Sequence, residues 1–328
     1  MDLVNLTGGE PTLHPQLGAL LRECLRPEIG RVTMNTNGLR LAEDTALCEQ
    51  LAELEVCVVL SFNTFDPEVS RRIHGQDVVA AKLKALENLT RAGVRVTLLN
   101  VLIRDLNEAA LAGLFDLLRT NQRVLSLTVQ TMTYTGQGGG QFPGRAHLPV
   151  DAAARLLCEH SRGLLESADF LPRPAAHPLC YAVAYLLKDG DRLLPMSRFV
   201  PREKLQAMLC DSYLLRLHRE DELREIIDDV YARNQADALR AFRGLFARLF
   251  PPQGGIDAFA RQRLAEESVR TIYLHAHMDE DTFDCSRAML CPDLVPAEPG
   301  RLIPACTYNL FYRRLDDRFY GREADADG

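Results

Sequence analysis

The chain has 328 residues, 47% of them hydrophobic and 25% charged, which suits a globular protein with one large domain or two of ordinary size. Its formal net charge of −7 argues against a nucleic-acid-binding surface, so we expect no nucleic-acid partner. No apolar run approaches the roughly 20 residues that cross a bilayer, and no secretory signal precedes the first predicted strand, so we expect no transmembrane segment.

The first predicted strand, residues 3–6, runs into Gly8, Gly9, Glu10 and Pro11, and an amphipathic helix follows. Two adjacent glycines let backbone groups approach a ligand with no Cβ between them, and Pro11 fixes φ after the turn. Glu10 adds an acceptor for a cationic group. The segment therefore predicts a ligand-binding loop, with an unliganded strand-to-helix turn as the alternative.

Strand-like and helix-like patterns alternate over the first 150 residues. The apolar, β-branched runs lie at residues 3–6, 32–34, 56–62, 94–103 and 124–129, and helical periodicities separate them. Strand followed by helix, repeated, predicts parallel strands with right-handed crossovers. We therefore predict an α/β protein with a partial (β/α) barrel, whose ligands bind at the carboxyl ends of the strands.

Short polar side chains follow or end several of these predicted strands. They are Asn35, Ser61, Asn63 and Asn100. Such groups can hydrogen-bond a ribose, a carboxylate or an adenine edge, and the alternative is that they only start turns.

The rest of the chain is predicted to form a second region. Glycines 136–140 predict a lid or linker after the barrel, and residues 201–250 predict a helical hairpin. We divide the chain into a barrel at 1–148 and a C-terminal α+β extension at 149–328.

Nine cysteines without a secretion signal indicate a reducing compartment and predict a cytoplasmic protein. Four of them, together with the short segments around them, predict a soft-metal or iron–sulfur site: Cys180, Cys285, Cys291 and Cys306. Two alternatives stay open, namely thiols buried as small hydrophobes and a zinc site, although the short CxxC hooks of structural zinc sites are absent. We expect the other five to lie in the core: Cys24, Cys48, Cys57, Cys158 and Cys210. His275 and His277 share one face of a strand-like run, as a ligand pair or, as we favour, in a hydrogen-bonded structural role.

The strand, Gly8-Gly9-Glu10-Pro11 and helix together resemble the methionine-binding segment of the radical S-adenosylmethionine (SAM) enzymes. The resemblance implies that this loop holds the amino group of SAM. It also implies that the strand-end residues contact SAM: Asn35, Ser61, Asn63 and Asn100. The family core has six strands, so it further implies that the first strand is missing here.

The segments His177-Pro178-Leu179-Cys180 and Ile303-Pro304-Ala305-Cys306 resemble those of the radical SAM group that includes the tetraether lipid synthases. This resemblance implies an auxiliary [4Fe–4S] cluster with Cys180, Cys291 and Cys306 as ligands. Cys285 is a fourth candidate without a clear family equivalent. It also implies an apolar or lipid substrate, carbon–carbon bond formation and an electron-donor protein.

The family holds its SAM-cleaving cluster with a CxxxCxxC motif upstream of the glycine loop, and the 328 residues contain no such motif. We therefore expect that the isolated chain does not cleave SAM by itself. Three hypotheses remain: a radical SAM enzyme or most of one, a non-catalytic SAM- or cluster-binding remnant, and a metal-independent (β/α)-barrel enzyme.

Overall fold

The computed structural model describes residues 1–135, 142, 147–210, 215, 217, 219–298 and 300–313. Within these ranges no helix combines the length and apolarity that a bilayer crossing requires. The glycine run at 136–140, predicted as a lid or linker, lies outside the described residues.

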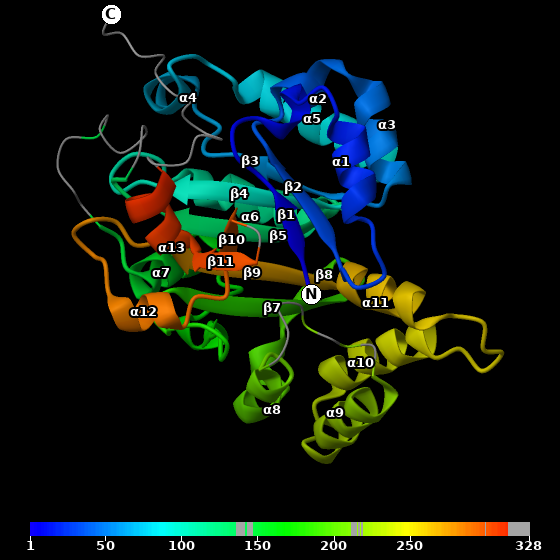
Figure 1. Cartoon of the computed structure of the whole chain (residues 1–328). Helices are drawn as coiled ribbons and strands as arrows, with labels where there is room; N and C mark the ends of the chain where they lie inside the picture. The colour runs from blue at the N-terminus through cyan, green and yellow to red at the C-terminus, as the bar shows by residue number, and fades with distance from the viewer. Residues whose placement is uncertain are drawn as a thin grey trace, which may run out of the picture.

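One mixed sheet, with nine strands among the described residues, lies at the centre of the fold (Figure 1). Its neighbours run in the order β1 (Val4–Leu6), β2 (Val32–Thr36), β3 (Cys57–Ser61), β4 (Val96–Leu102), β5 (Val124–Thr131), β9 (Val269–Ala276), β7 (Tyr181–Asp189) and β6 (Leu171–Pro172), and β8 (Arg192–Pro195) pairs with β7. The row from β1 through β9 is parallel, whereas β7 is antiparallel to β9, and β6 and β8 are antiparallel to β7. The predicted α/β class and the partial barrel are confirmed, and each of the five predicted strands forms.

Helices follow the strands as the periodicities predict. Their bounds are α1 (Leu17–Cys24), α2 (Leu39–Glu43), α3 (Thr45–Glu53), α4 (Pro67–His74), α5 (Val79–Ala92), α6 (Ala110–Thr120), α7 (Val150–His160), α8 (Arg202–Ala207), α9 (Glu220–Ala232), α10 (Ala236–Leu249), α11 (Ala258–Glu267), α12 (Cys285–Met289) and α13 (Ala305–Thr307). The single turns η1 (Pro11–Leu13), η3 (Ser167–Asp169), η4 (Met196–Arg198) and η5 (Tyr308–Tyr312) and the hairpin β10 (Leu294–Glu298) and β11 (Arg301–Pro304) complete the described elements. Gly93 ends α5 with φ +83°, a backbone conformation that glycine adopts without a Cβ penalty.

Two hydrophobic cores share the sheet. The first lies between the barrel strands and the helices α1–α3 and α5–α7 and includes Met34, Leu98 and Phe115. The second lies between β7 and the helical hairpin α9–α10 and includes Val183 and Phe242. Alternate residues of β7 enter different cores, which explains why its first seven residues are all buried.

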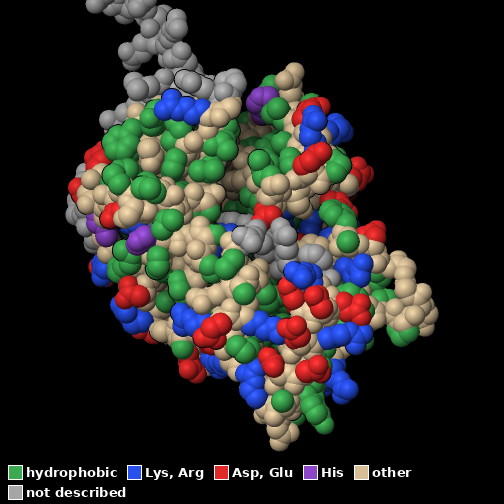
Figure 2. Space-filling view, turned by 60° about the horizontal axis from the view of Figure 1, so that its bottom comes forward, with side chains coloured by type: hydrophobic (Ala, Val, Ile, Leu, Met, Phe, Trp, Pro, Cys, Tyr) green, Lys and Arg blue, Asp and Glu red, His purple; other side chains and the backbone are tan. Residues whose placement is uncertain are grey.

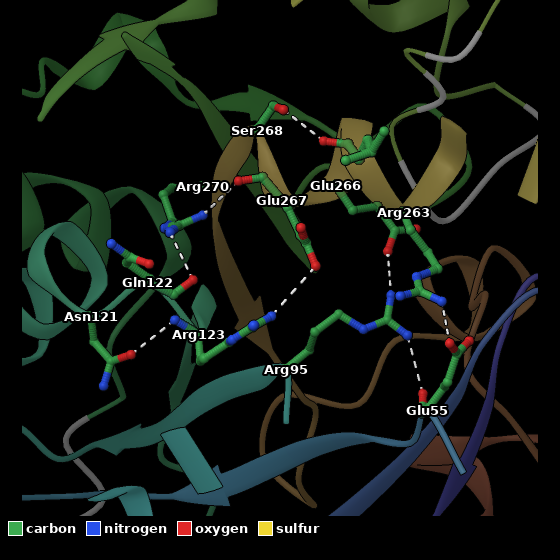
Figure 3. Close-up of polar contacts among 11 residues, drawn as sticks. Glu55, Arg95, Asn121, Gln122, Arg123, Arg263, Glu266, Glu267, Ser268 and Arg270 are labelled. Atoms are coloured by element: carbon green, nitrogen blue, oxygen red, sulfur yellow. Dashed lines mark hydrogen bonds and ion pairs between the residues drawn. The ribbon is translucent and has the colours of Figure 1, made fainter. Parts of the chain in front are cut away.

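The amino ends of the barrel strands are joined to α11 and β9 by a polar network (Figure 3). Glu266, near the end of α11, accepts from Arg31 at 2.5 Å and from Arg95 at 3.1 Å, and all three side chains are largely buried. Arg263 also pairs with Glu55, and the buried Arg270 donates to the carbonyls of Leu118, Gln122 and Glu267. The network fixes the base of the barrel, at the end opposite the strand tops.

The strand β9 is the main feature that the sequence analysis did not place. It pairs in parallel with β5, although 137 residues separate Thr131 from Val269 along the chain, and it extends the parallel row to six strands. The expectation that Cys210 lies in the core is wrong, because Cys210 is exposed after α8. Cys48 and Cys57 are buried as expected, while Cys24 and Cys158 are half-buried.

The division at residues 148 and 149 stays a prediction. The helix α7, from the second region, packs in the first core, and β7 contributes to both cores.

Candidate functional site

All six parallel strands end at one edge of the sheet, and both predicted constellations lie along this edge. The glycine loop follows β1, and Asn35 and Ser61 lie at or near the ends of β2 and β3. His277 follows β9, and Cys180 precedes β7, which runs the other way, so that Tyr181 pairs with His275. The constellations therefore share the carboxyl edge, where such sheets bind ligands.

The glycine loop leaves its backbone open. Gly8 has φ +132°, which favours glycine, and a Cβ added to Gly9 would meet no atom within 4 Å. Packing within the described protein therefore does not require glycine at position 9. An open backbone at a strand top fits a ligand that approaches closely.

Glu10 ties this loop to the end of β2. Its Oε1 accepts from the hydroxyls of Thr12 at 2.6 Å and Thr36 at 2.7 Å, and its Oε2 accepts from the backbone N–H of Asn37 at 2.7 Å. The carboxylate thus holds the loop in place. Each carboxylate oxygen can accept two hydrogen bonds, so Oε2 retains capacity for a further donor. Its predicted contact with the amino group of SAM stays a prediction.

Lys82 is a buried cation beneath this loop that the sequence analysis missed. Its Nζ donates to the carbonyls of Asn37 at 3.0 Å and Ser61 at 2.6 Å and so joins the ends of β2 and β3. Burial lowers the pKa of Lys82 to about 8, against the opposing charge of Glu10. One signal was available: Lys82 lies three residues after Val79 and four before Leu86, on the core face of α5.

The four predicted strand-end residues divide into two pairs. Asn35 and Ser61 alternate with core residues Met34 and Leu60, so they face the other side of the sheet, and their side chains form no hydrogen bond within the described ranges. These two are available to a ligand on the inner side of the barrel.

Asn63 and Asn100 instead join the ends of β3 and β4. Asn100 donates to the carbonyls of Phe62 at 3.2 Å and Asn63 at 3.1 Å, and Asn63 accepts from the N–H of Val101 at 2.8 Å. Both are buried. Their predicted contact with SAM stays a prediction.

Three of the four predicted cysteines come together. The thiol of Cys306 is buried, and this burial, together with the nearby Cys291 and Cys180, raises its pKa to about 11. Cys306 Sγ accepts from the N–H of Met278 at 3.3 Å, and Cys180 Sγ accepts from Arg287 Nε at 3.3 Å. We call Cys180, Cys291 and Cys306 the cysteine cluster.

Cys285 lies apart from these contacts. It begins α12, is exposed, and forms no hydrogen bond through its thiol in the part of the chain that the structure describes. Its role as a ligand stays a prediction.

The two predicted histidines border the cysteine cluster. His277 Nδ1 lies 3.5 Å from Cys306 Sγ, and the rings of His275 and His277 lie 3.8 Å apart. His275 also stacks on Tyr181 at 3.9 Å. Burial lowers the pKa of both imidazoles, that of His275 well below its usual value, so both are neutral near pH 7 and able to bind a metal.

The donor set of the cysteine cluster suits an iron–sulfur group. Thiolates are the ligands of such clusters, and hydrogen bonds to the sulfurs are part of their usual surroundings. Among the described residues, the set of three or more donor atoms within 4.8 Å of one another is His147, Asp279 and Asp281. The sulfurs of the cysteine cluster are thus spaced more widely than ligands of a single tetrahedral ion.

A pocket lies beside the cysteine cluster, on the α7 side of the sheet. Its volume is about 480 Å³, and apolar groups from the end of β5, from α7 and from the segment before β7 form most of its lining. Its polar lining includes His147, His277 and Arg287. We call it the α7 pocket.

Figure 2 shows basic and acidic side chains mixed over the lower half of the view, where α9 and α10 lie, and hydrophobic side chains gathered at the upper left.

Comparisons with known proteins bear on the same regions. The family model described as the radical SAM superfamily matches residues 2–118. The 7,8-dihydro-6-hydroxymethylpterin dimethyltransferase of Methanocaldococcus jannaschii is 22% identical in an alignment that covers 96% of this chain and 68% of that protein. The GTP 3′,8-cyclase of Pasteurella multocida is 32% identical over 33% of this chain and 32% of the relative. The solved Streptococcus suis SuiB bound to S-adenosylmethionine is 21% identical, with a TM-score of 0.40, over 47% of this chain and 34% of that one.

The described fold is an open (β/α) barrel with a glycine loop at the carboxyl end of its first strand. Over residues 2–118 the chain is similar to the radical SAM superfamily. The chain spans about two thirds of the dimethyltransferase and a third of the Pasteurella cyclase.

Proposed function

We propose that this chain is a radical SAM enzyme, or most of one, that binds SAM between the glycine loop and the inner side of the barrel. Gly8, Gly9 and Glu10 receive the methionine part, and Asn35 and Ser61 face the same side. When bound, SAM and a reduced iron–sulfur cluster supply radical chemistry at a substrate C–H bond. The observation that supports this proposal most is the open backbone of Gly9 at a strand top inside the segment that matches the family.

The proposal includes an auxiliary [4Fe–4S] cluster on Cys180, Cys291 and Cys306, which accepts or delivers an electron, with an electron-donor protein as partner. Cys285 is the fourth cysteine predicted from the sequence, but it is exposed at the start of α12. We therefore favour His277 as the fourth donor, because its Nδ1 lies 3.5 Å from Cys306 Sγ.

For the substrate, we propose an apolar or lipid molecule on which a carbon–carbon bond forms, and the largely apolar lining of the α7 pocket supports this. A pterin-like substrate that receives methyl groups is a second candidate, because the alignment with the named pterin dimethyltransferase covers 96% of this chain. A non-catalytic protein that binds SAM or a cluster is the alternative to an enzyme.

Binding of SAM tests the proposal without requiring its cleavage. Gly9→Leu adds a side chain that meets no protein atom within 4 Å at its Cβ, so the fold tolerates it while the ligand does not. We expect isothermal titration calorimetry to show SAM binding that Gly9→Leu weakens at least tenfold.

Gly244→Leu is the matched control, because Gly244 lies on the exposed face of α10 and a Cβ there also meets nothing within 4 Å. It should bind SAM like the unmodified chain, and neither variant should melt at a lower temperature than the unmodified chain. Absence of SAM binding to the unmodified chain, or equal affinity in Gly9→Leu, contradicts the proposed site.

A further inference from the structure

We propose that the α7 pocket binds a small molecule with an apolar body and a single carboxylate, which Arg287 receives. The existence of this binding site does not depend on the proposed function. The identification of its ligand as a substrate does rest on the proposed function. The pocket lies between α7 and the ends of β5, β9 and β7, on the side of the sheet opposite Asn35 and Ser61. It is therefore separate from the site proposed for SAM.

The volume and the lining of the pocket indicate a small ligand with an apolar body. Its volume of about 480 Å³ lies in the usual range of small-molecule sites. Apolar side chains from separate segments face it, among them Leu148, Phe170 and Leu179. Leu179 is 60% exposed although it is large and apolar, so a bound apolar group would cover a surface that now faces water.

Arg287 indicates that the ligand carries a negative charge. The residue is only 9% exposed, yet within the described residues it forms no ion pair with a carboxylate. Its Nε donates to Cys180 Sγ at 3.3 Å and one terminal nitrogen donates to the carbonyl of Ala276 at 3.0 Å. The other terminal nitrogen, Nη1, has no protein partner in the described ranges. A buried guanidinium without a counter-ion is costly, and a bound anion would remove that cost.

Several other polar groups of the pocket lining are already paired. Arg155 pairs with Asp151 at 2.7 Å, and His147 and Thr282 both contact Asp279, at 2.6 Å and 2.8 Å. Of the two arginines that line the pocket, Arg155 therefore has a carboxylate partner and Arg287 has none within the described ranges. A single charge with one unpartnered nitrogen matches a monoanionic carboxylate better than a phosphate dianion, which requires more donors.

The contact between Arg287 and Cys180 connects the α7 pocket to the proposed auxiliary cluster. The same side chain lines the pocket and donates to a sulfur of the cysteine cluster. A carboxylate on Arg287 would therefore hold the apolar body of the ligand next to that cluster.

The test compares octanoate, octan-1-ol and octyl phosphate by isothermal titration calorimetry on the full chain without added SAM or iron. We expect octanoate to bind at least tenfold more tightly than octan-1-ol. Arg287→Met should abolish this difference, whereas Arg155→Met, at an exposed and paired position of the same lining, should preserve it. Tighter binding of octyl phosphate than of octanoate contradicts the assignment of a carboxylate.

Ala154→Leu provides a second variant, because Ala154 lines the pocket from α7 and the larger side chain occupies it without touching the arginine contacts that hold Cys180. It should weaken octanoate binding at least fivefold and leave SAM binding unchanged. Equal binding of octanoate and octan-1-ol, or unchanged octanoate binding in Arg287→Met and Ala154→Leu, overturns the proposal. Loss of SAM binding in Gly9→Leu is a separate result, so the two sites fail or succeed independently.

Discussion

Two charged side chains, those of Glu10 and Lys82, hold neighbouring segments together at the carboxyl ends of the first barrel strands. Glu10 holds the glycine loop to β2, and Lys82 holds the end of β2 to that of β3. The charge of Glu10 opposes the effect of burial on Lys82 only in part, because the pKa of Lys82 stays low. The geometry of the proposed SAM site therefore depends on one buried ammonium group.

The depressed pKa of Lys82 makes stability depend on pH. In the unfolded chain its pKa is near 10.5, and in the folded chain it is about 8, so the unfolded state binds more protons between these values. The free energy of unfolding should rise with pH across this window by about 3 kcal/mol from this group.

Urea unfolding at pH 7.5 and 10.5 checks this expectation. Lys82→Met should lose most of the rise, whereas Lys84→Met, at an exposed position of the same helix, should keep it. The same pH slope in Lys82→Met and in the unmodified chain would show that Lys82 is not the group responsible.

The cysteine cluster gives a second prediction at this scale. Anaerobic reconstitution with iron and sulfide should give a coloured protein, and Cys306→Ser should lose more than half of the bound iron, because Cys306 is buried between the other two sulfur donors and His277. Cys285→Ser should retain it, since Cys285 is exposed at the start of α12.

Iron content and absorbance of the purified variants decide between these outcomes. Iron loss in Cys285→Ser equal to that in Cys306→Ser would instead place Cys285 among the ligands. A colourless unmodified protein would favour the metal-independent barrel enzyme.

At the scale of elements, α11 and β9 close the base of the barrel through Glu266. This carboxylate pairs with Arg31 and Arg95, which lie before β2 and β4, and all three side chains are at most 19% exposed. Since the partners are cations in a largely buried site, removing the carboxylate leaves them uncompensated.

Glu266→Gln should therefore lower the free energy of unfolding by about 3 kcal/mol. The matched control is Glu23→Gln, whose carboxylate pairs with Arg26 on the surface, where both side chains are more than 60% exposed. The control should change stability by less than about 1 kcal/mol. Denaturant unfolding measures both, and equal effects would mean that the network in Figure 3 contributes no more than a surface pair.

At the scale of the whole molecule, both proposed sites lie on the carboxyl edge of one sheet. The glycine loop follows β1 at one side of the parallel row, and the cysteine cluster lies beside β9 and β7 at the other. The α7 pocket opens next to that cluster, on the face that the helices cover. A radical SAM enzyme with this layout would bring an apolar acid to the cluster from the side opposite SAM.

The sequence by itself determined the features that depend on neighbouring residues. Apolar, β-branched runs predicted the five barrel strands, and helical periodicities predicted the helices between them. The glycine loop was recognisable because its residues are consecutive. These features depend on local backbone preferences, which a short window of sequence contains.

Only the tertiary structure decided which distant segments meet. It inserted β9 beside β5, joined Cys180 to Cys291 and Cys306 while leaving Cys285 exposed, and buried Lys82 and Arg287 against backbone carbonyls. Pairing between segments more than 100 residues apart depends on the packing of the whole chain, and burial of a charge depends on what surrounds it. Neither is encoded in the residues next to it.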